Sequence, residues 1–178
     1  PGMDKQGIFK LRTPKDAAGI RSYIETTRAA RALVIGAGFI GLETAENLMA
    51  QGLAVTVVEA APQILPNVLD SEMAAYIQRQ LQGKGLQILT GVKASSVLGD
   101  AKATGLQTEM GPLNGDLIIA SAGIRPNTAF LQDIGLEMTK GTILVNEHLQ
   151  TNLPDIYAAG DCAMVTNRLT KAPQWSPM

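Results

Sequence analysis

The sequence has few of the residues on which disulfide frameworks, metal centres and nucleic-acid surfaces depend. It contains one Cys and one His in 178 residues, which excludes an internal disulfide and gives no basis for a metal site. Its formal net charge is −1 and it has no basic cluster, so no nucleic-acid partner is expected. No apolar run reaches the roughly 20 residues that a membrane-spanning helix needs, so we expect no membrane partner. The scarcity of cysteine suits the cytoplasm, which is the expected location.

The remaining composition is that of a globular protein, and the length is sufficient for one core of ordinary domain size. The chain begins with Pro1 and Gly2 and stops at Pro177 and Met178, and neither end looks like a natural terminus. We therefore expect it to be a piece cut from a longer protein.

Residues 31–59 carry the most informative pattern in the chain. The apolar run 31–35 predicts a short buried parallel strand. A helical pattern follows, with apolar residues from Ile40 onward expected on its inward side, and residues 53–58 predict a second buried strand that ends at Glu59. The turn from the first strand into the helix carries three glycines at the spacing of the dinucleotide-binding fingerprint: Gly36, Gly38 and Gly41.

Each glycine has a physical task in such a turn. Gly36 permits the tight turn, Gly38 lets the backbone approach a pyrophosphate, and Gly41 lets the helix pack closely on the strand. The helix that begins near Phe39 directs free N–H groups and its positive dipole end toward the phosphates. The alternative is a βαβ unit with a tight glycine turn and no ligand, but the complete strand–turn–helix–strand context favours the dinucleotide site.

Glu59 indicates which dinucleotide is bound. Its carboxylate can accept hydrogen bonds from both hydroxyls of an adenine ribose. A 2′-phosphate would meet this negative charge without a nearby cation, since Ala60, Ala61 and Pro62 follow. The sequence therefore favours NAD(H) as the cofactor over NADP(H).

The rest of the chain predicts a Rossmann-type α/β fold, in which a parallel sheet has helices on both faces and an antiparallel β-meander replaces one crossover helix. Thr13, Pro14 and Asp16 are typical of a helix start with a capping box, and that helix is expected to end near residue 27. Ser71 begins a further helix, which completes a second βαβ unit. The other expected elements are strands at 7–12, 86–90 and 116–121, the meander at 92–113, a short helix at 127–133 and a hairpin around 140–141.

Four stretches of the chain together resemble a known family. They are VIGAGFIGLETAENL (34–48), VTVVEAAPQILP (55–66), DLIIASAGIRPN (116–127) and TNLPDIYAAGDCA (151–163). Through them the chain resembles, over nearly its whole length, the NAD-binding domain of the FAD-dependent pyridine nucleotide-disulfide oxidoreductases. Within that family it is most similar to the branch of NADH oxidases, NADH peroxidases and coenzyme A-disulfide reductases.

The resemblance implies a domain that is inserted into a FAD domain. Residues 1–28 would be the N-terminal arm that leaves the FAD domain, residues 29–147 the NAD(H)-binding domain, and residues 148–178 the segment that returns. The full-length protein would bind FAD, form a homodimer and pass hydride from NADH to FAD and on to a disulfide, oxygen or peroxide acceptor. The family's FAD fingerprint, redox cysteine motif and dimerisation domain are not in this sequence, so the missing FAD and dimerisation domains would be its partners.

The same resemblance assigns further cofactor-binding residues. Phe39 matches an aromatic position that covers the nicotinamide pocket, and we include the adjacent Ile40. Glu43 matches a helix glutamate near the nicotinamide, and Gly123 lies in a loop that passes close to the dinucleotide. Asp161 matches an aspartate that contacts the ribityl-phosphate region of the flavin. Three of these have structural alternatives: a hydrophobic contact for Phe39, a solvated carboxylate for Glu43 and a turn without a ligand for Asp161.

No catalytic residue is expected within this chain. Cys162 and His148 have no neighbour in the sequence that would activate them, so they are interpreted as structural or surface residues. The isolated chain is expected to be inactive, and it could be a pure binding module or an inert piece whose surfaces pack on the missing domains. Without those domains, residues 8–11 and 156–157 are expected to lose their packing partners and to pair with one another, become disordered or associate between chains.

Overall fold

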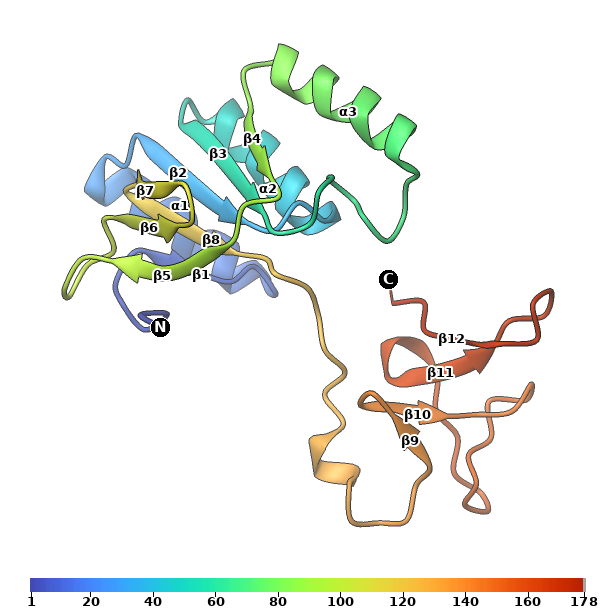
Figure 1. Cartoon of the computed structure of the whole chain (residues 1–178). Coiled ribbons are helices and arrows are strands. Elements are labelled where there is room, and N and C mark those ends of the chain that lie inside the picture. Colours follow the sequence, from blue (N-terminus) through green and yellow to red (C-terminus); the bar gives the residue numbers. More distant parts are fainter. Residues whose placement is uncertain (178) are drawn as a thin grey trace. The chain divides into compact units, whose positions relative to one another are not determined.

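The computed structural model describes residues 1–177, and the chain forms two compact units (Figure 1). The first unit is Pro1–Gly123 and the second begins at Ile124. Within the described residues, no helix combines the length and the apolar character needed to span a membrane. The same residues contain no group of three or more His, Cys, Asp or Glu side chains that could hold a metal ion.

The first unit is built on a five-stranded parallel sheet with the strand order β1-β8-β2-β3-β4. The central strands are apolar runs that are buried on both faces of the sheet, as strands of a parallel sheet require. Val34 lies at the centre, paired with Val57 on one side and Ile119 on the other. The strands are β1 Ile8–Phe9, β2 Arg31–Ile35, β3 Ala54–Glu59, β4 Gln87–Thr90 and β8 Leu117–Ala120.

Three α-helices connect these strands, and two of them begin with a side-chain cap. The helix α1 (Pro14–Thr27) has the predicted capping box, in which Asp16 N–H donates to the Thr13 side chain and Thr13 N–H donates to the Asp16 carboxylate. The helix α3 (Ser71–Gly83) begins after Asp70, whose carboxylate accepts a hydrogen bond from Met73 N–H. The helix α2 (Phe39–Ala50) has no such cap.

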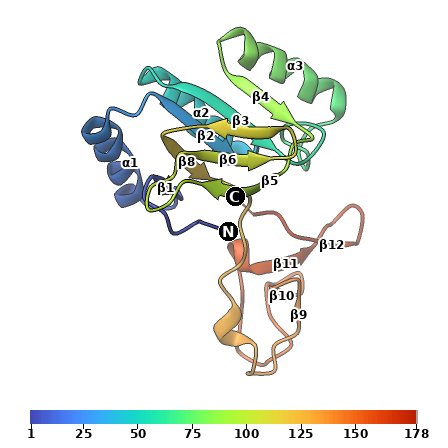
Figure 2. The ribbon, with the colours of Figure 1, turned by 60° about the vertical axis from the view of Figure 1, so that its left-hand side comes forward.

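The three helices cover one face of the sheet, and an antiparallel meander covers the other (Figures 1 and 2). Tyr23 of α1, Leu48 of α2 and Leu81 of α3 belong to a single core with one face of the strands. On the opposite face, Ile118 of β8 packs with Leu106 of the meander. The meander consists of β5 Ala94–Leu98, β6 Gly105–Thr108 and β7 Gly111–Asn114.

The Rossmann-type α/β fold and the meander crossover are thus confirmed, but the helices lie on one face of the sheet and not on both. The reason is the direction in which the chain winds. The connections from β1 to β2, from β2 to β3 and from β3 to β4 all step the same way along the sheet. Right-handed crossovers that step in one direction place their helices on the same face.

Residues 1–28 pack within the first unit. The strand β1 pairs with β8, and the Phe9 ring contacts Tyr23 of α1 with 5.3 Å between the ring centroids. Gln6 extends the contact to the meander, since its N–H donates to Ala101 O and its carbonyl accepts from Ala103 N–H. The expectation that residues 8–11 lose their packing partners is therefore wrong. The boundaries predicted at residues 28 and 147 stay a prediction about the longer protein.

The second unit contains a four-stranded sheet with the order β12-β11-β10-β9. The predicted hairpin around residues 140–141 is confirmed as β9 and β10. The predicted helix at 127–133 is shortened to the 3-10 helix Ala129–Leu131, because so short a segment gains too few hydrogen bonds to sustain an α-helix. The elements are β9 Met138–Thr139, β10 Thr142–Leu144, the 3-10 helix Gly160–Cys162, β11 Ala163–Thr166 and β12 Pro173–Gln174.

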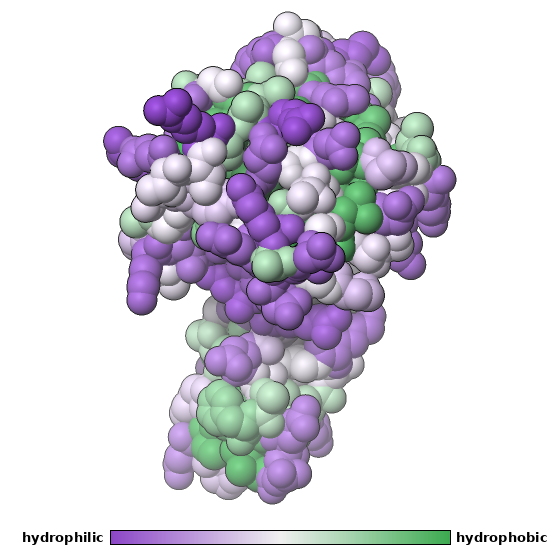
Figure 3. Space-filling view, turned by 90° about the vertical axis from the view of Figure 1, so that its left-hand side faces the viewer, coloured by the Kyte–Doolittle hydropathy of each residue, from purple (hydrophilic) through white to green (hydrophobic). Residues whose placement is uncertain are grey.

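Apolar side chains are exposed on the second unit. Phe130 is 76% exposed, and Ile156 and Tyr157 are also exposed. On the face shown in Figure 3, hydrophobic residues gather at this unit. Its small core is formed by Ile143, Val145, Ala158 and Ala163.

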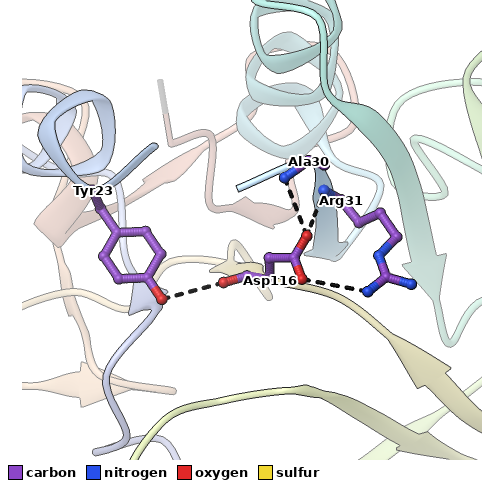
Figure 4. Close-up of polar contacts among 4 residues, drawn as sticks. All are labelled: Tyr23, Ala30, Arg31 and Asp116. Atoms are coloured by element: carbon purple, nitrogen blue, oxygen red, sulfur yellow. Dashed lines mark hydrogen bonds and ion pairs between the residues drawn. The ribbon is translucent and has the colours of Figure 1, made fainter. Parts of the chain in front are cut away.

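Asp116 joins the amino ends of β2 and β8 (Figure 4). Its Oδ2 accepts hydrogen bonds from the N–H groups of Ala30 and Arg31 at 3.1 and 3.0 Å, and its Oδ1 lies 3.4 Å from the Arg31 guanidinium. The Asp116 carbonyl accepts a hydrogen bond from the Tyr23 hydroxyl at 3.3 Å. Partial burial by itself raises the pKa of Asp116, but the N–H groups and the guanidinium outweigh it and lower the pKa below the ordinary aspartate value.

Replacing Asp116 with Asn should reduce the free energy of unfolding at pH 7 by about 1 kcal/mol, because the hydrogen bonds lose their charge assistance. Since the folded-state pKa is lowered, this stabilisation is present above the pKa of the unfolded chain and is lost as the pH falls through the folded-state pKa. Urea denaturation at a series of pH values measures the difference between Asp116→Asn and wild type. The exposed Asp4→Asn is the control. A difference that persists unchanged in strong acid would contradict the assignment.

Candidate functional site

Two of the three fingerprint glycines are required by close contacts within the protein. Gly36 directly follows β2 with a φ of 101°, in the left-handed region, and a Cβ atom there would lie 2.7 Å from Ser121 O. A Cβ at Gly41 would lie 2.0 Å from Gly36 O, well inside any real contact distance. These two residues are therefore glycine because the first turn of α2 is pressed against the ends of β2 and β8.

Gly38 is different, because nothing in the protein requires a glycine there. Its φ of −78° and ψ of −177° are extended values that any residue adopts. A Cβ built on it would meet no protein atom within 4 Å. The space beside Gly38 is open at the start of α2, where a ligand's phosphates would approach a helix terminus.

The amino end of α2 is left free for an acceptor from outside the chain. It has neither a side-chain cap nor an acidic residue in its first turn, whereas α1 and α3 have both. Within residues 1–177, the backbone N–H groups of Phe39, Ile40 and Gly41 have no protein acceptor. Unpaired N–H groups and the positive end of the helix dipole together favour an anion here.

Phe39 and Ile40 are exposed at this helix end, by 57% and 44% respectively. The expectation that Ile40 faces the core is therefore wrong. Leu42, in the same turn, is buried in the core. Ile40 is two residues away, so it lies on the opposite side of the helix and faces away from the sheet.

Glu59, at the end of β3, holds the glycine turn through its carboxylate. Its Oε2 accepts a hydrogen bond from Ala37 N–H and its Oε1 accepts one from Ala61 N–H, each at 2.7 Å. A carboxylate has about four lone-pair sites, so both oxygens can still accept hydroxyl protons from a ligand. Residues 60–70 contain no Lys or Arg, so the charge of Glu59 meets no cation from that loop.

Ser121 is a residue of this site that the motifs did not predict. It directly follows β8, and its hydroxyl donates to Ile35 O at 2.8 Å and lies 3.4 Å from Gly36 O. The sequence did contain a signal for Ser121, namely its position. A polar residue at the end of a buried parallel strand lies at the edge where the other strands also end.

The structure brings most of the predicted residues to the carboxyl edge of the first sheet. Gly123, two residues after Ser121, has a φ of 84°, in the left-handed region that glycine adopts readily because it has no Cβ. Glu43 is exposed on α2 beyond the first turn. Asp161 belongs to the second unit, where its carbonyl accepts a hydrogen bond from Trp175 Nε1 at 2.8 Å. The glycine turn, the amino end of α2, Glu59, Ser121 and Gly123 all belong to the first unit.

The arrangement of glycine turn, free helix terminus and carboxylate agrees with the family match. Residues 1–176 match the family described as pyridine nucleotide-disulphide oxidoreductase. The chain belongs to this family.

Relatives in this family are redox enzymes longer than this chain. The chain is 38% identical over 176 residues to an NADH oxidase of Methanocaldococcus jannaschii, covering 99% of this chain and 39% of the relative. It is 32% identical to a coenzyme A disulfide reductase of Staphylococcus haemolyticus, covering 99% of this chain and 40% of that protein. The chain thus spans about two fifths of the length of these relatives.

Solved structures of similar oxidoreductases have the same fold over the length of this chain. A NAD-dependent persulfide reductase from A. fulgidus superposes with a TM-score of 0.93 at 32% identity, over 99% of this chain and 33% of that one. A water-forming NADH oxidase from Lactobacillus brevis, bound to NADH, gives a TM-score of 0.90 at 29% identity, over 100% of this chain and 39% of that one. An engineered NADPH oxidase derived from it, bound to NADPH, gives 0.90 at 28% identity with the same coverage.

The different roles of Gly38 and Gly41 can be separated by making the same substitution at each position. Gly41→Ala should lower the free energy of unfolding by about 3 kcal/mol, because the added methyl group overlaps a backbone carbonyl. Gly38→Ala should change it by at most about 1 kcal/mol, since the space is open and only the helix cap is affected. Urea denaturation measures both. As a control, Gly83→Ala in α3, where no atom lies within 4 Å, should stabilise by about 0.5–1 kcal/mol. If alanine at Gly38 lowered the free energy of unfolding as much as alanine at Gly41, the two glycines would not have these different roles.

Proposed function

We propose that this chain is the NAD(H)-binding domain of a larger FAD-dependent oxidoreductase. The observation that carries the proposal is Gly38, a glycine whose conformation and surroundings in the protein do not require it. An external group that approaches the backbone closely accounts for it. The neighbouring N–H groups and helix dipole select an anion as that group, and the pyrophosphate of a dinucleotide fits.

In this proposal the first unit binds and orients the dinucleotide. The N–H groups of Phe39 and Ile40 donate to the pyrophosphate, and Glu59 accepts hydrogen bonds from the adenine ribose hydroxyls. Phe39, Ile40, Glu43 and Gly123 border the path toward the nicotinamide. When bound, the dinucleotide supplies the hydride, and the residues of this chain hold it in place.

The proposal favours NADH over NADPH. A 2′-phosphate beside Glu59 would place two negative charges together, and residues 60–70 offer no cation to offset them. The two solved oxidases fit this reasoning. The NADH-bound enzyme was converted to one bound to NADPH by substitutions that include an aspartate replaced by alanine and two arginines introduced.

We further infer that the parent protein passes the hydride to FAD and then to a disulfide, oxygen or peroxide acceptor. This rests on the names of the relatives, which include an NADH oxidase and a coenzyme A disulfide reductase. Residues 1–28 and 148–178 would connect to the FAD domain, where Asp161 would contact the flavin. The parent would act as a homodimer. This chain supplies no catalytic residue, so alone it would bind NADH without turning it over.

Calorimetric titration of the 178-residue chain with NADH tests the binding site. The wild-type chain should bind NADH, and Gly38→Ala should raise the Kd at least about tenfold, because its methyl group occupies the path of the pyrophosphate. Gly83→Ala, with the same added methyl group away from the site, should bind as wild type does. A folded wild-type chain that does not bind NADH, or a Gly38→Ala chain that binds it equally well, would argue against the proposal.

The cofactor preference follows from Glu59 and is tested by comparing NADH with NADPH. Wild type should bind NADPH at least about tenfold more weakly than NADH. Glu59→Ala should raise the Kd for NADH about 10- to 100-fold, since it removes an ionised acceptor of two hydroxyl groups. The exposed Glu72→Ala in α3 is the matched control. Tighter binding of NADPH by wild type would overturn the role of Glu59.

A further inference from the structure

We propose that Ser121 is a positioning residue, whose hydroxyl fixes the glycine turn in the geometry that receives the dinucleotide. The part of this inference that concerns the ligand rests on the proposed function. Ser121 lies within the stretch 116–127 that carries the family resemblance, but the resemblance assigns it no role. It follows β8, a strand that is far from the glycine turn along the chain.

Ser121 contacts the turn through both its backbone and its side chain. Its N–H and its hydroxyl donate to the same carbonyl, Ile35 O, at 2.9 and 2.8 Å. The hydroxyl also lies 3.4 Å from Gly36 O. Ile35 is the last residue of β2, so this double contact holds the point where the strand becomes the glycine turn.

The two glycines of the turn enclose Ser121 closely. A Cβ at Gly36 would lie 2.7 Å from Ser121 O, and a Cβ at Gly41 would lie 2.8 Å from Ser121 Oγ. The hydroxyl therefore fills the space between the turn and the first turn of α2. Without the Ser121 hydroxyl oxygen, a gap would open between the glycine turn and the start of α2, where those two glycines allow close packing.

The hydroxyl contributes to the turn rather than to the sheet. Without it, Ser121 N–H still donates to Ile35 O, so the pairing of β2 with β8 is kept. The turn would lose one of its restraints, while Glu59 still holds Ala37 N–H. The first free N–H groups of α2 follow within three residues, so a shift of the turn moves the donors that face the pyrophosphate.

The experiment compares Ser121→Ala with Ser95→Ala in the 178-residue chain. Ser95 is the matched control, because its hydroxyl also donates to a backbone carbonyl, Gln107 O, but on the meander. Three quantities are measured: the amide exchange rates of Gly36 and Ala37 without ligand, the Kd for NADH, and the Tm. Both of these amides are hydrogen-bonded, to Val58 O and to Glu59 respectively, so their exchange reports on the turn.

Ser121→Ala should speed the exchange of these two amides about tenfold and raise the Kd for NADH about three- to tenfold, as expected for one lost hydrogen bond. Its Tm should match that of Ser95→Ala. Unchanged exchange rates, or an unchanged Kd in a chain whose wild type binds NADH, would overturn the proposal. A fall in Tm with an unchanged Kd would also overturn the proposal, because Ser121 would then have a purely structural role. If Ser121→Ala speeds amide exchange but the wild-type chain binds no NADH, Ser121 still fixes the glycine turn. In that case only the proposed function is overturned.

Discussion

The close approach of α2 to the end of β2 is the contact on which the rest of the first unit depends. With 2.0 Å between a hypothetical Cβ at Gly41 and Gly36 O, no other residue fits there without moving the helix. The approach places the amino end of α2 at the carboxyl edge of the sheet, where ligands of open α/β sheets bind. The same contact that packs the helix on the strand therefore also presents its free N–H groups. The same geometry therefore sets both the packing of α2 and the proposed binding site.

The elements that were predictable from the sequence are those specified by neighbouring residues. The capping box of Thr13 and Asp16 marks the start of α1, and the apolar runs mark β2, β3 and β8, because turn chemistry and periodicity are local properties. The side on which the helices lie was not predictable in this way. It depends on the order β1-β8-β2-β3-β4, in which the first strand pairs with one that is more than 100 residues away. That pairing also places residues 1–28 in the first unit.

The residues of the candidate site also fall into those specified by neighbouring sequence and those that depend on distant strands. Gly36, Gly38, Gly41 and Glu59 were predictable because one continuous motif contains all four. Ser121 was not, since the partner of its hydroxyl is determined by which strand lies beside β2. Asp161 was assigned to a flavin contact through the family resemblance, and it lies in the second unit, which has its own small core. Its role depends on a flavin domain that is not part of this chain, so contacts within the chain do not test the assignment.

In the proposed function, Glu59 connects the preference for NADH to the shape of the site. Its two oxygens already accept the N–H groups of Ala37 and Ala61, so the carboxylate ties the glycine turn to the loop after β3. A neutral aliphatic side chain at this position would remove the charge that opposes a 2′-phosphate, and it would also leave two N–H donors without an acceptor. A preference for NADPH would then require both a cation in residues 60–70 and a new acceptor for the turn. Because one carboxylate serves both purposes, the proposed preference for NADH would be tied to the fold of the turn itself.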